Sequence, residues 1–193
     1  MRWSRKKIVV TTSLIVLFAS VIAGCSSSSS SDDTGANRTD PGVNLTPGLG
    51  TNANNNGKKF LFVEMQDVAS GADVTIVPTG TPMVINFWFS ACPPCIREMP
   101  TLSEAAEKYG DRVQFVGVNP NDSREVAQAF LKNLDIKFAS YIDDGDQLSA
   151  VEVATFPTTF FLDAEGVIVK MQSGELKKED IESILRDDLG VAG

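Results

Sequence analysis

The chain of 193 residues contains no histidine, and this absence excludes several kinds of site at once. A triad with a histidine base, a zinc or haem site with imidazole ligands and a histidine pH switch all need the missing side chain. Cysteine is scarce, with only Cys25, Cys92 and Cys95. Basic residues number 17 against 25 acidic ones, and the formal net charge of -8 argues against a nucleic-acid partner. The 42% of hydrophobic residues is enough for one packed domain.

The N-terminal segment has the layout of a secretory signal. Four basic side chains lie within residues 2–7, and an uncharged, mostly apolar run of 16 residues follows from Ile8 to Ala23. The closing sequence Ile-Ala-Gly-Cys resembles a bacterial lipobox, which implies acylation of Cys25 and cleavage just before it. The alternative is an uncleaved membrane helix, for which this run is short. We therefore predict a signal peptide over residues 1–24 and a lipid anchor at Cys25, on the extracytoplasmic face of the bacterial membrane.

A stretch of low complexity follows the predicted anchor. Six consecutive serines, Ser26 to Ser31, lead into residues dominated by Gly, Asn, Thr and Pro up to Gly57. This composition offers too little apolar surface to offset chain entropy, so residues 25–57 are predicted to be the acylated cysteine and a disordered tether. Removal of the signal leaves 13 basic and 25 acidic residues, a net charge of -12. Attachment to an anionic membrane would therefore depend on acyl chains.

Residues 58–193 are predicted to fold as one α/β domain. Strands that alternate with helices and end in a hairpin indicate a mixed central sheet flanked by helices, with an N-terminal β-hairpin that turns at Ser70-Gly71. Asp122, with a Glu three residues later, marks the start of the second helix. The apolar runs predict strands at 60–65, 73–77, 83–89, 113–118, 138–142, 158–162 and 167–172, and the amphipathic stretches predict helices at 93–109, 123–134, 146–151 and 177–189.

Cys92 and Cys95 lie where an apolar strand is predicted to meet a helix, and Pro93 and Pro94 separate them. Free N–H groups and the positive end of the helix dipole stabilise a thiolate, which is the nucleophilic form of cysteine. Two intervening residues let the sulfurs close a ring, so that Cys95 can resolve a mixed disulfide formed on Cys92. Neither proline has an N–H to donate. We therefore expect a modestly stabilised thiolate and a reducing couple.

Three other uses of the cysteine pair are open from the residues alone. A zinc site would need two further Cys or His ligands, and a copper site would lack imidazole. A purely structural disulfide across two residues closes a loop too small to add much stability. The sequence therefore favours thiol-disulfide exchange, with no metal and no cofactor.

The residues around the pair resemble a known family. The segment Val84 to Pro100 (VINFWFSACPPCIREMP) is similar to the active-site region of thioredoxin-fold proteins, and most of all to the TlpA/ResA/CcmG-type thiol-disulfide oxidoreductases of the bacterial envelope. The segment Thr155 to Asp163 (TFPTTFFLD), followed by Glu165-Gly166, is similar to the second motif of that family. The resemblance covers residues 59 to 189 and implies a thioredoxin-like fold.

The resemblance implies a role for each matched residue. Cys92 would be the exposed attacking cysteine and Cys95 the buried resolving one. Pro157 would be cis and face them, while the backbone of Phe156 would form strand-like hydrogen bonds to a bound polypeptide. Glu98 matches an acidic residue that would raise the thiol pKa and relay a proton. The alternative for Glu98 is a first-turn residue that merely complements the helix dipole.

The implied function is the reduction of disulfides in exported proteins, with the cytochrome c apoprotein as one substrate. The protein would be a monomer, and a membrane thiol reductant would restore its dithiol. Within the same class, the alternative is an oxidant or isomerase. A peroxidase of the peroxiredoxin type is disfavoured, since the Pro and Thr expected before its cysteine are absent. The alternative from another class is a lipoprotein that uses the scaffold for binding without redox turnover.

Overall fold

The computed structural model describes residues 51–191 of the chain. The predicted signal peptide, Cys25 and the tether up to residue 50 lie outside the described residues. Within residues 51–191, no helix has both the length and the apolar character needed to cross a membrane.

The described residues contain one mixed sheet and four helices. The strands are β1 (Glu64–Asp67), β2 (Asp73–Thr75), β3 (Met83–Phe87), β4 (Gln114–Asn119), β5 (Ala139–Ile142), β6 (Thr158–Leu162) and β7 (Ile168–Ser173). The helices are α1 (Pro93–Tyr109), α2 (Arg124–Asn133), α3 (Asp146–Ala150) and α4 (Lys178–Asp187). The sheet order is β2-β1-β5-β4-β3-β6-β7, with β3/β4 and β4/β5 parallel and the other neighbours antiparallel. The predicted mixed sheet and N-terminal hairpin are thus confirmed.

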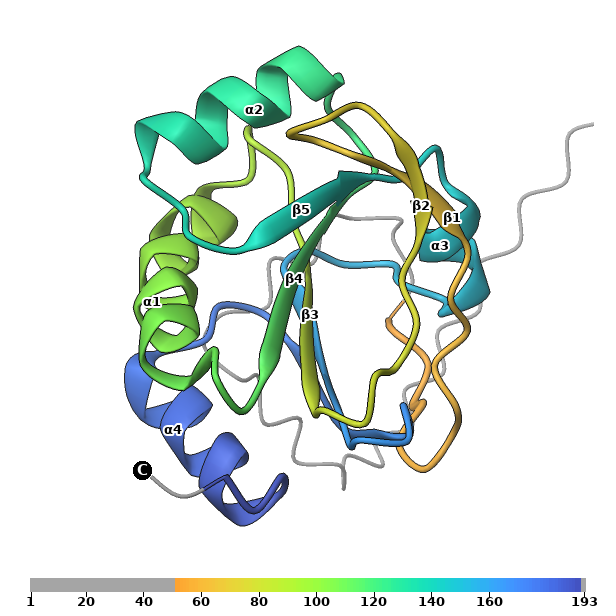
Figure 1. Cartoon of the computed structure of the whole chain (residues 1–193), viewed down its shortest axis with the longest axis vertical. Helices are drawn as coiled ribbons and strands as arrows, with labels where there is room; N and C mark the ends of the chain where they lie inside the picture. The colour runs from red at the N-terminus through yellow and green to blue at the C-terminus, as the bar shows by residue number, and fades with distance from the viewer. Residues whose placement is uncertain (1–50, 192–193) are drawn as a thin grey trace, which may run out of the picture. The chain divides into compact units, whose positions relative to one another are not determined.

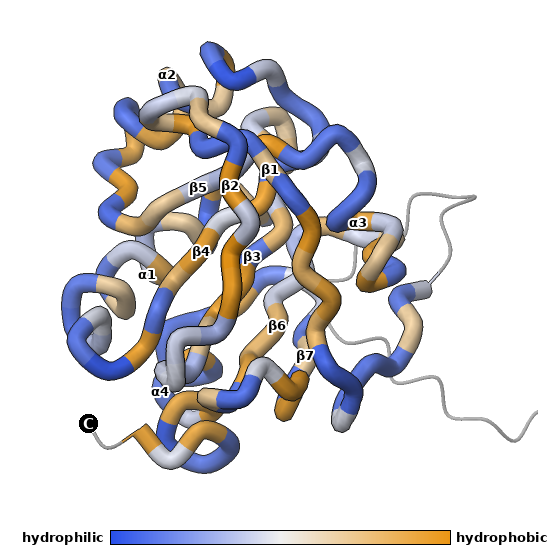
Figure 2. The backbone as a smooth tube through the Cα atoms, turned by 45° about the vertical axis from the view of Figure 1, so that its right-hand side comes forward, coloured by the Kyte–Doolittle hydropathy of each residue, from blue (hydrophilic) through white to orange (hydrophobic). Residues whose placement is uncertain are grey.

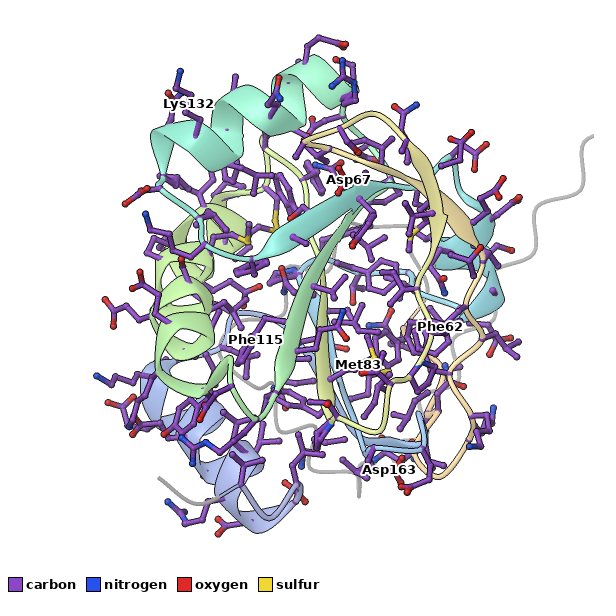
Figure 3. The ribbon with its side chains drawn as sticks, viewed as in Figure 1. Phe62, Asp67, Met83, Phe115, Lys132 and Asp163 are labelled. Carbon is purple, nitrogen blue, oxygen red and sulfur yellow. A yellow bond between two sulfur atoms is a disulfide. The ribbon has the colours of Figure 1, made fainter. Side chains whose placement is uncertain are left out.

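Successive side chains of a strand point to opposite sides of the sheet, and on the central strands both sides are buried. Val84, Phe115 and Phe161 pack with residues of α1 and α4, which lie side by side (Figure 1). Met83 and Phe160 pack in a separate cluster on the other face. Met83 and Phe115, both labelled in Figure 3, accordingly lie on opposite sides of the sheet. Figure 2 shows hydrophobic stretches along the central strands.

The first strand begins later than predicted. The apolar run that starts at Phe60 predicts a strand over 60–65, whereas β1 begins at Glu64. The side chain of Gln147 takes the place of a neighbouring strand here: its Nε2 donates to the Leu61 C=O at 2.6 Å, and its Oε1 accepts from the Val63 N–H at 2.9 Å. Because a side chain satisfies these backbone groups, residues 61–63 need no partner strand.

The start of α2 also differs from the prediction. Ser123, not Asp122, is the N-cap residue, and its hydroxyl accepts a first-turn N–H. The Asp122 carboxylate instead accepts from the N–H of Ser90 at 2.7 Å and from the Ser90 hydroxyl at 2.9 Å. Asn119 Nδ2 donates to the same carboxylate at 2.7 Å. Asp122 therefore ties the end of β4 to the loop that precedes the cysteine pair.

Residues 51–57 belong to the folded domain, so the predicted tether extends too far. Asn55 is 5% exposed, and its Nδ2 donates to the Val151 C=O at 2.8 Å. The Gly57 N–H donates to the Ile168 C=O at 2.7 Å. The polar composition indicated a solvated chain, but asparagine amides can satisfy the backbone groups of a neighbouring segment. The prediction of disorder is therefore wrong for residues 51–57.

Candidate active site

The cysteine pair lies at the N-terminus of α1. Cys92 is the N-cap residue, with an extended backbone, and Pro93 and Pro94 occupy the first two helical positions. Since proline has no N–H, Cys95 supplies the first helical N–H that can form a hydrogen bond. That N–H donates to Cys92 Sγ at 3.3 Å. The strand-to-helix junction thus presents the attacking sulfur to a helix N-terminus with few free donors.

Cys92 and Cys95 form a disulfide, with their Cα atoms 5.2 Å apart. Cys95 is fully buried, and Cys92 is only 3% exposed. The expectation that Cys92 is exposed is therefore wrong for this oxidised form. The physical reason is that its sulfur is bonded to Cys95 within an apolar cluster that includes Trp88 and Met99. Cys92 nevertheless lines a surface groove, and Cys95 does not.

The groove beside Cys92 has a volume of about 590 Å³. Its walls come from the loop before α1, from the first residues of α1 and from the loop before β6. Phe89 and Phe156 contribute aromatic rings that pack edge to face, with centroids 5.3 Å apart. Among the described residues, no charged side chain lines it, and Asn121 and Thr155 supply its polar side chains. The groove therefore suits an uncharged segment of a bound chain.

The loop before β6 contains the cis peptide bond that the resemblance implies. The Phe156–Pro157 peptide bond is cis, and Pro157 is buried. Phe156 packs against the cluster that contains both cysteines, and it lines the groove. No hydrogen bond within residues 51–191 uses the backbone N–H or C=O of Phe156. These two groups can therefore pair with an extended polypeptide that enters the groove.

Glu98 lies on α1, one helical turn beyond Cys95, and is 1% exposed. Its Oε1 accepts from Asn86 Nδ2 at 2.7 Å, and its Oε2 accepts from the Leu176 N–H at 2.8 Å. Burial raises the pKa of Glu98 to about 8; the hydrogen bonds oppose this rise, and the nearby Glu175 carboxylate adds to it. The alternative that Glu98 only complements the helix dipole is wrong, because the residue is buried and lies beyond the first turn.

Asn86 connects Glu98 to the centre of the sheet. Its Nδ2 also donates to Thr159 Oγ1 at 2.9 Å, whereas its buried Oδ1 has no hydrogen-bond partner among the described residues. When Glu98 is neutral, a proton on Oε1 leaves Oε2 free to accept from the Leu176 N–H. A 180° rotation of the Asn86 amide would then present Oδ1 to that proton. The position of Asn86 as the polar residue in the run MVINF is the sequence signal for this contact.

Two residues that support the site have no clear signal in the sequence. Asp122 holds the loop before Cys92 but resembles an ordinary helix cap, and Asn52 holds the loop before β6 but lies in a polar stretch. No group of three or more His, Cys, Asp or Glu side chains in residues 51–191 is arranged to hold a metal ion.

A mixed sheet, a Cys-Pro-Pro-Cys disulfide at the start of α1 and a cis-proline loop on the same groove define a thioredoxin-like protein. The chain belongs to the Redoxin family, whose model matches residues 56–189. The predicted family and fold are therefore confirmed. The match also begins before residue 58, in agreement with the folded state of the preceding residues.

Individual relatives agree with this assignment. Thiol-disulfide oxidoreductase ResA of Bacillus cereus is 32% identical over 109 residues, which are 55% of this chain and 63% of that protein. The chain thus matches less than two thirds of the length of this relative. A secreted Mycobacterium tuberculosis disulfide oxidoreductase, described as homologous to E. coli DsbE, is 25% identical with a TM-score of 0.58, covering 63% of this chain and 92% of that one. The exposed lipoprotein thioredoxin of Streptococcus pneumoniae is 27% identical with a TM-score of 0.58, covering 66% of this chain and 99% of that one.

Proposed function

We propose that the protein is a thiol-disulfide oxidoreductase that acts outside the cytoplasm on disulfides of other polypeptides. The observation that carries the proposal is the Cys92–Cys95 disulfide at the N-terminus of α1, with Cys92 on an uncharged groove beside Phe156. The name of the relative from Bacillus cereus, and the secreted relative from Mycobacterium tuberculosis, support this class of activity.

In the reducing direction, the reaction takes two exchange steps. The Cys92 thiolate attacks one sulfur of the substrate disulfide, and the other substrate sulfur leaves as a thiolate. The Cys95 thiolate then attacks Cys92 Sγ, which closes the Cys92–Cys95 disulfide and releases the second substrate sulfur. Two electrons pass to the substrate. A dithiol partner, proposed to be a membrane thiol reductant, must then reduce the pair again.

Glu98 is the group proposed to take the proton of the Cys95 thiol. It lies on the same helix one turn away, and its pKa of about 8 lets it gain or lose a proton near neutral pH. A buried carboxylate so placed also disfavours a second negative charge and so raises the thiol pKa. Glu98 is therefore proposed to take up the proton of Cys95 in the step in which Cys95 attacks Cys92 and the substrate is released.

The direction of electron flow is proposed to be reductive. Both residues between the cysteines are prolines, and the N–H of Cys95 is the helix donor to Cys92 Sγ. Weak stabilisation of the thiolate disfavours the dithiol form and makes the couple more reducing. Equilibration with glutathione buffers measures this potential. A value near about -120 mV, as for a strong oxidant, would contradict the reductive direction and support an oxidant or isomerase.

The proposed location is the outer face of the bacterial membrane, with a lipid anchor on Cys25. The lipobox-like sequence supports this location, and a structural relative is itself an exposed lipoprotein thioredoxin. Exported proteins with disulfides, including the cytochrome c apoprotein, are the proposed substrates. Labelling with a radioactive fatty acid tests the anchor, because Cys25→Ala should abolish the label that the native chain acquires.

Reduction of insulin in the presence of dithiothreitol tests the activity itself. The native protein should accelerate insulin precipitation, and Cys92→Ser should not. Absence of activity in the native protein would favour a binding lipoprotein without redox turnover. Cys95→Ser removes the resolving thiol, so substrates should remain covalently attached to Cys92 and can be identified by mass spectrometry.

A further inference from the structure

Residues 52–58 form a strap along the outer edge of β7. Asn52 lies beside Ser173 at the end of this strand, and the Ile168 N–H at its start donates to the Lys58 C=O at 2.9 Å. The strap therefore runs antiparallel to β7 and pairs with the backbone of Ile168 at the start of its outer edge. On its other side, it contacts the cis-proline loop, residues 151–157, which forms one wall of the groove.

Asn52 is the main link between the strap and the cis-proline loop. Its Oδ1 accepts from the Ala154 N–H at 2.6 Å and from the Thr155 N–H at 3.1 Å. Its Nδ2 donates to Thr158 Oγ1 at 2.6 Å and to Ser173 Oγ at 2.7 Å. An asparagine amide can accept two hydrogen bonds at its oxygen and donate two from its nitrogen. All four hydrogen bonds that the Asn52 amide can form are thus used, two to the loop, one to the start of β6 and one to the end of β7.

These contacts decide which backbone groups of the loop are free. The Thr155 C=O accepts from Thr158 Oγ1 at 2.8 Å, so both polar backbone groups of Thr155 are occupied. The next residue, Phe156, makes no backbone hydrogen bond within residues 51–191 and lies on the groove. A loop without such anchors would sample many conformations, and few of them would present Phe156 in this way.

We propose that Asn52 is a positioning residue for substrate: it holds the cis-proline loop in the conformation in which the Phe156 backbone can pair with an extended polypeptide. This inference rests on the proposed oxidoreductase function. When the competent conformation is only partly populated, apparent affinity falls in proportion to its population. Loss of the two hydrogen bonds to loop N–H groups should therefore raise KM about tenfold and leave kcat within about twofold.

Hydrogen exchange tests the inference without any assay of activity. In Asn52→Ala, the amides of Ala154 and Thr155 should exchange about tenfold faster than in the native protein, because they lose their acceptor. Asn56→Ala is the matched control, since Asn56 lies in the same strap but is exposed. It should leave exchange of these two amides unchanged. Equal protection of the two amides in Asn52→Ala and native protein would overturn the proposal. Thermal unfolding of each variant establishes that it is folded at the temperature of the experiment.

Kinetics with insulin then separates positioning from a general loss of structure. Asn52→Ala should raise KM, Asn56→Ala should not, and Asn52→Asp, which keeps the acceptor for the two loop N–H groups, should recover most of the loss. The rate at which iodoacetamide alkylates reduced Cys92 should be the same in all of them. If the alkylation rate of Asn52→Ala fell by the same factor as its kcat/KM, the effect would lie on the cysteine and the proposal would be overturned. Native protein that fails to reduce insulin would contradict the proposed function instead, while the exchange experiment would still decide the role of Asn52.

Discussion

The side-chain amide of Asn86 donates to Glu98 Oε1 at 2.7 Å, and both side chains are almost completely buried. This contact joins the middle of β3 to the helix that carries the cysteine pair. The carboxyl group is therefore held in a fixed place away from water. A change in its protonation therefore alters a hydrogen bond between the helix and the sheet.

Glu98→Gln should remove a pH dependence of stability. The pKa of Glu98 is about 8 in the folded protein and near 4.3 when unfolded, so the folded state binds the proton more tightly. Its contribution to stability is complete below about pH 4 and is progressively lost as pH rises through 8. The loss is on the order of 5 kcal/mol, since one pKa unit corresponds to about 1.36 kcal/mol.

Urea unfolding of the oxidised protein between pH 4 and 9 measures this effect. The stability of Glu98→Gln relative to the native protein should increase as the pH rises. Glu104→Gln, an exposed change on the same helix, is the control and should show no such trend. A difference between Glu98→Gln and native protein that stays constant with pH would show that the Glu98 carboxyl titrates normally.

Glu98→Gln should also slow the resolution of a mixed disulfide on Cys92. A glutamine keeps the shape and hydrogen-bonding capacity of the neutral acid but cannot accept a proton from the Cys95 thiol. A positioned base contributes about a hundredfold or more to proton transfer, so the rate at neutral pH should fall by at least about tenfold. Single-turnover reduction of insulin from pH 6 to 9 measures the profile. An unchanged profile would leave Glu98 a purely structural role.

Asp122→Ala should destabilise the loop that precedes the cysteine pair. The carboxylate accepts from the Ser90 N–H and hydroxyl and from Asn119 Nδ2, and alanine leaves these donors without their acceptor. These contacts are partly buried, so the expected loss is about 1 kcal/mol, at the low end of the cost of an unsatisfied buried donor. Thermal unfolding should show this loss, whereas Asp144→Ala, an exposed change at a residue without such contacts within residues 51–191, should be neutral. Equal midpoints for the two variants would mean that the Asp122 contacts add nothing to stability.

The sequence was sufficient where one local rule determines the structure. The apolar run at Met83 to Phe89 and the proline pair before Cys95 predicted a buried strand and a helix start, and both are present, although β3 ends at Phe87. The motifs around the cysteines and Pro157 also indicated the family. These features depend on residues that are close in the chain, so their patterns can be recognised without knowing the tertiary contacts.

The sequence was insufficient where a polar side chain satisfies a distant backbone. Asn52 and Gln147 bond to segments about 100 and 85 positions away, and neither has a pattern that predicts its partner. The same limit applies to Asp122, which a local rule assigns to the following helix although its carboxylate binds Ser90. The prediction that Cys92 is exposed was wrong for a related reason. The packing of Trp88 against the disulfide is a tertiary contact that no local pattern indicates.

Gly117 packs between Trp88 and Ser140. A Cβ at this position would lie 2.7 Å from Trp88 Nε1 and would overlap Ser140 Oγ. Trp88 cannot easily move, since it is fully buried and stacked on Phe130 with centroids 4.9 Å apart. Gly117→Ala should therefore cost about 1 to 3 kcal/mol of stability, as overpacking of a core does. Ser140→Ala alone should cost little, because the buried Ser140 hydroxyl has no hydrogen-bond partner in the part of the chain that the structure describes. The double variant should recover part of the loss, and strictly additive unfolding energies would show that the Ser140 hydroxyl is not what the added methyl group meets.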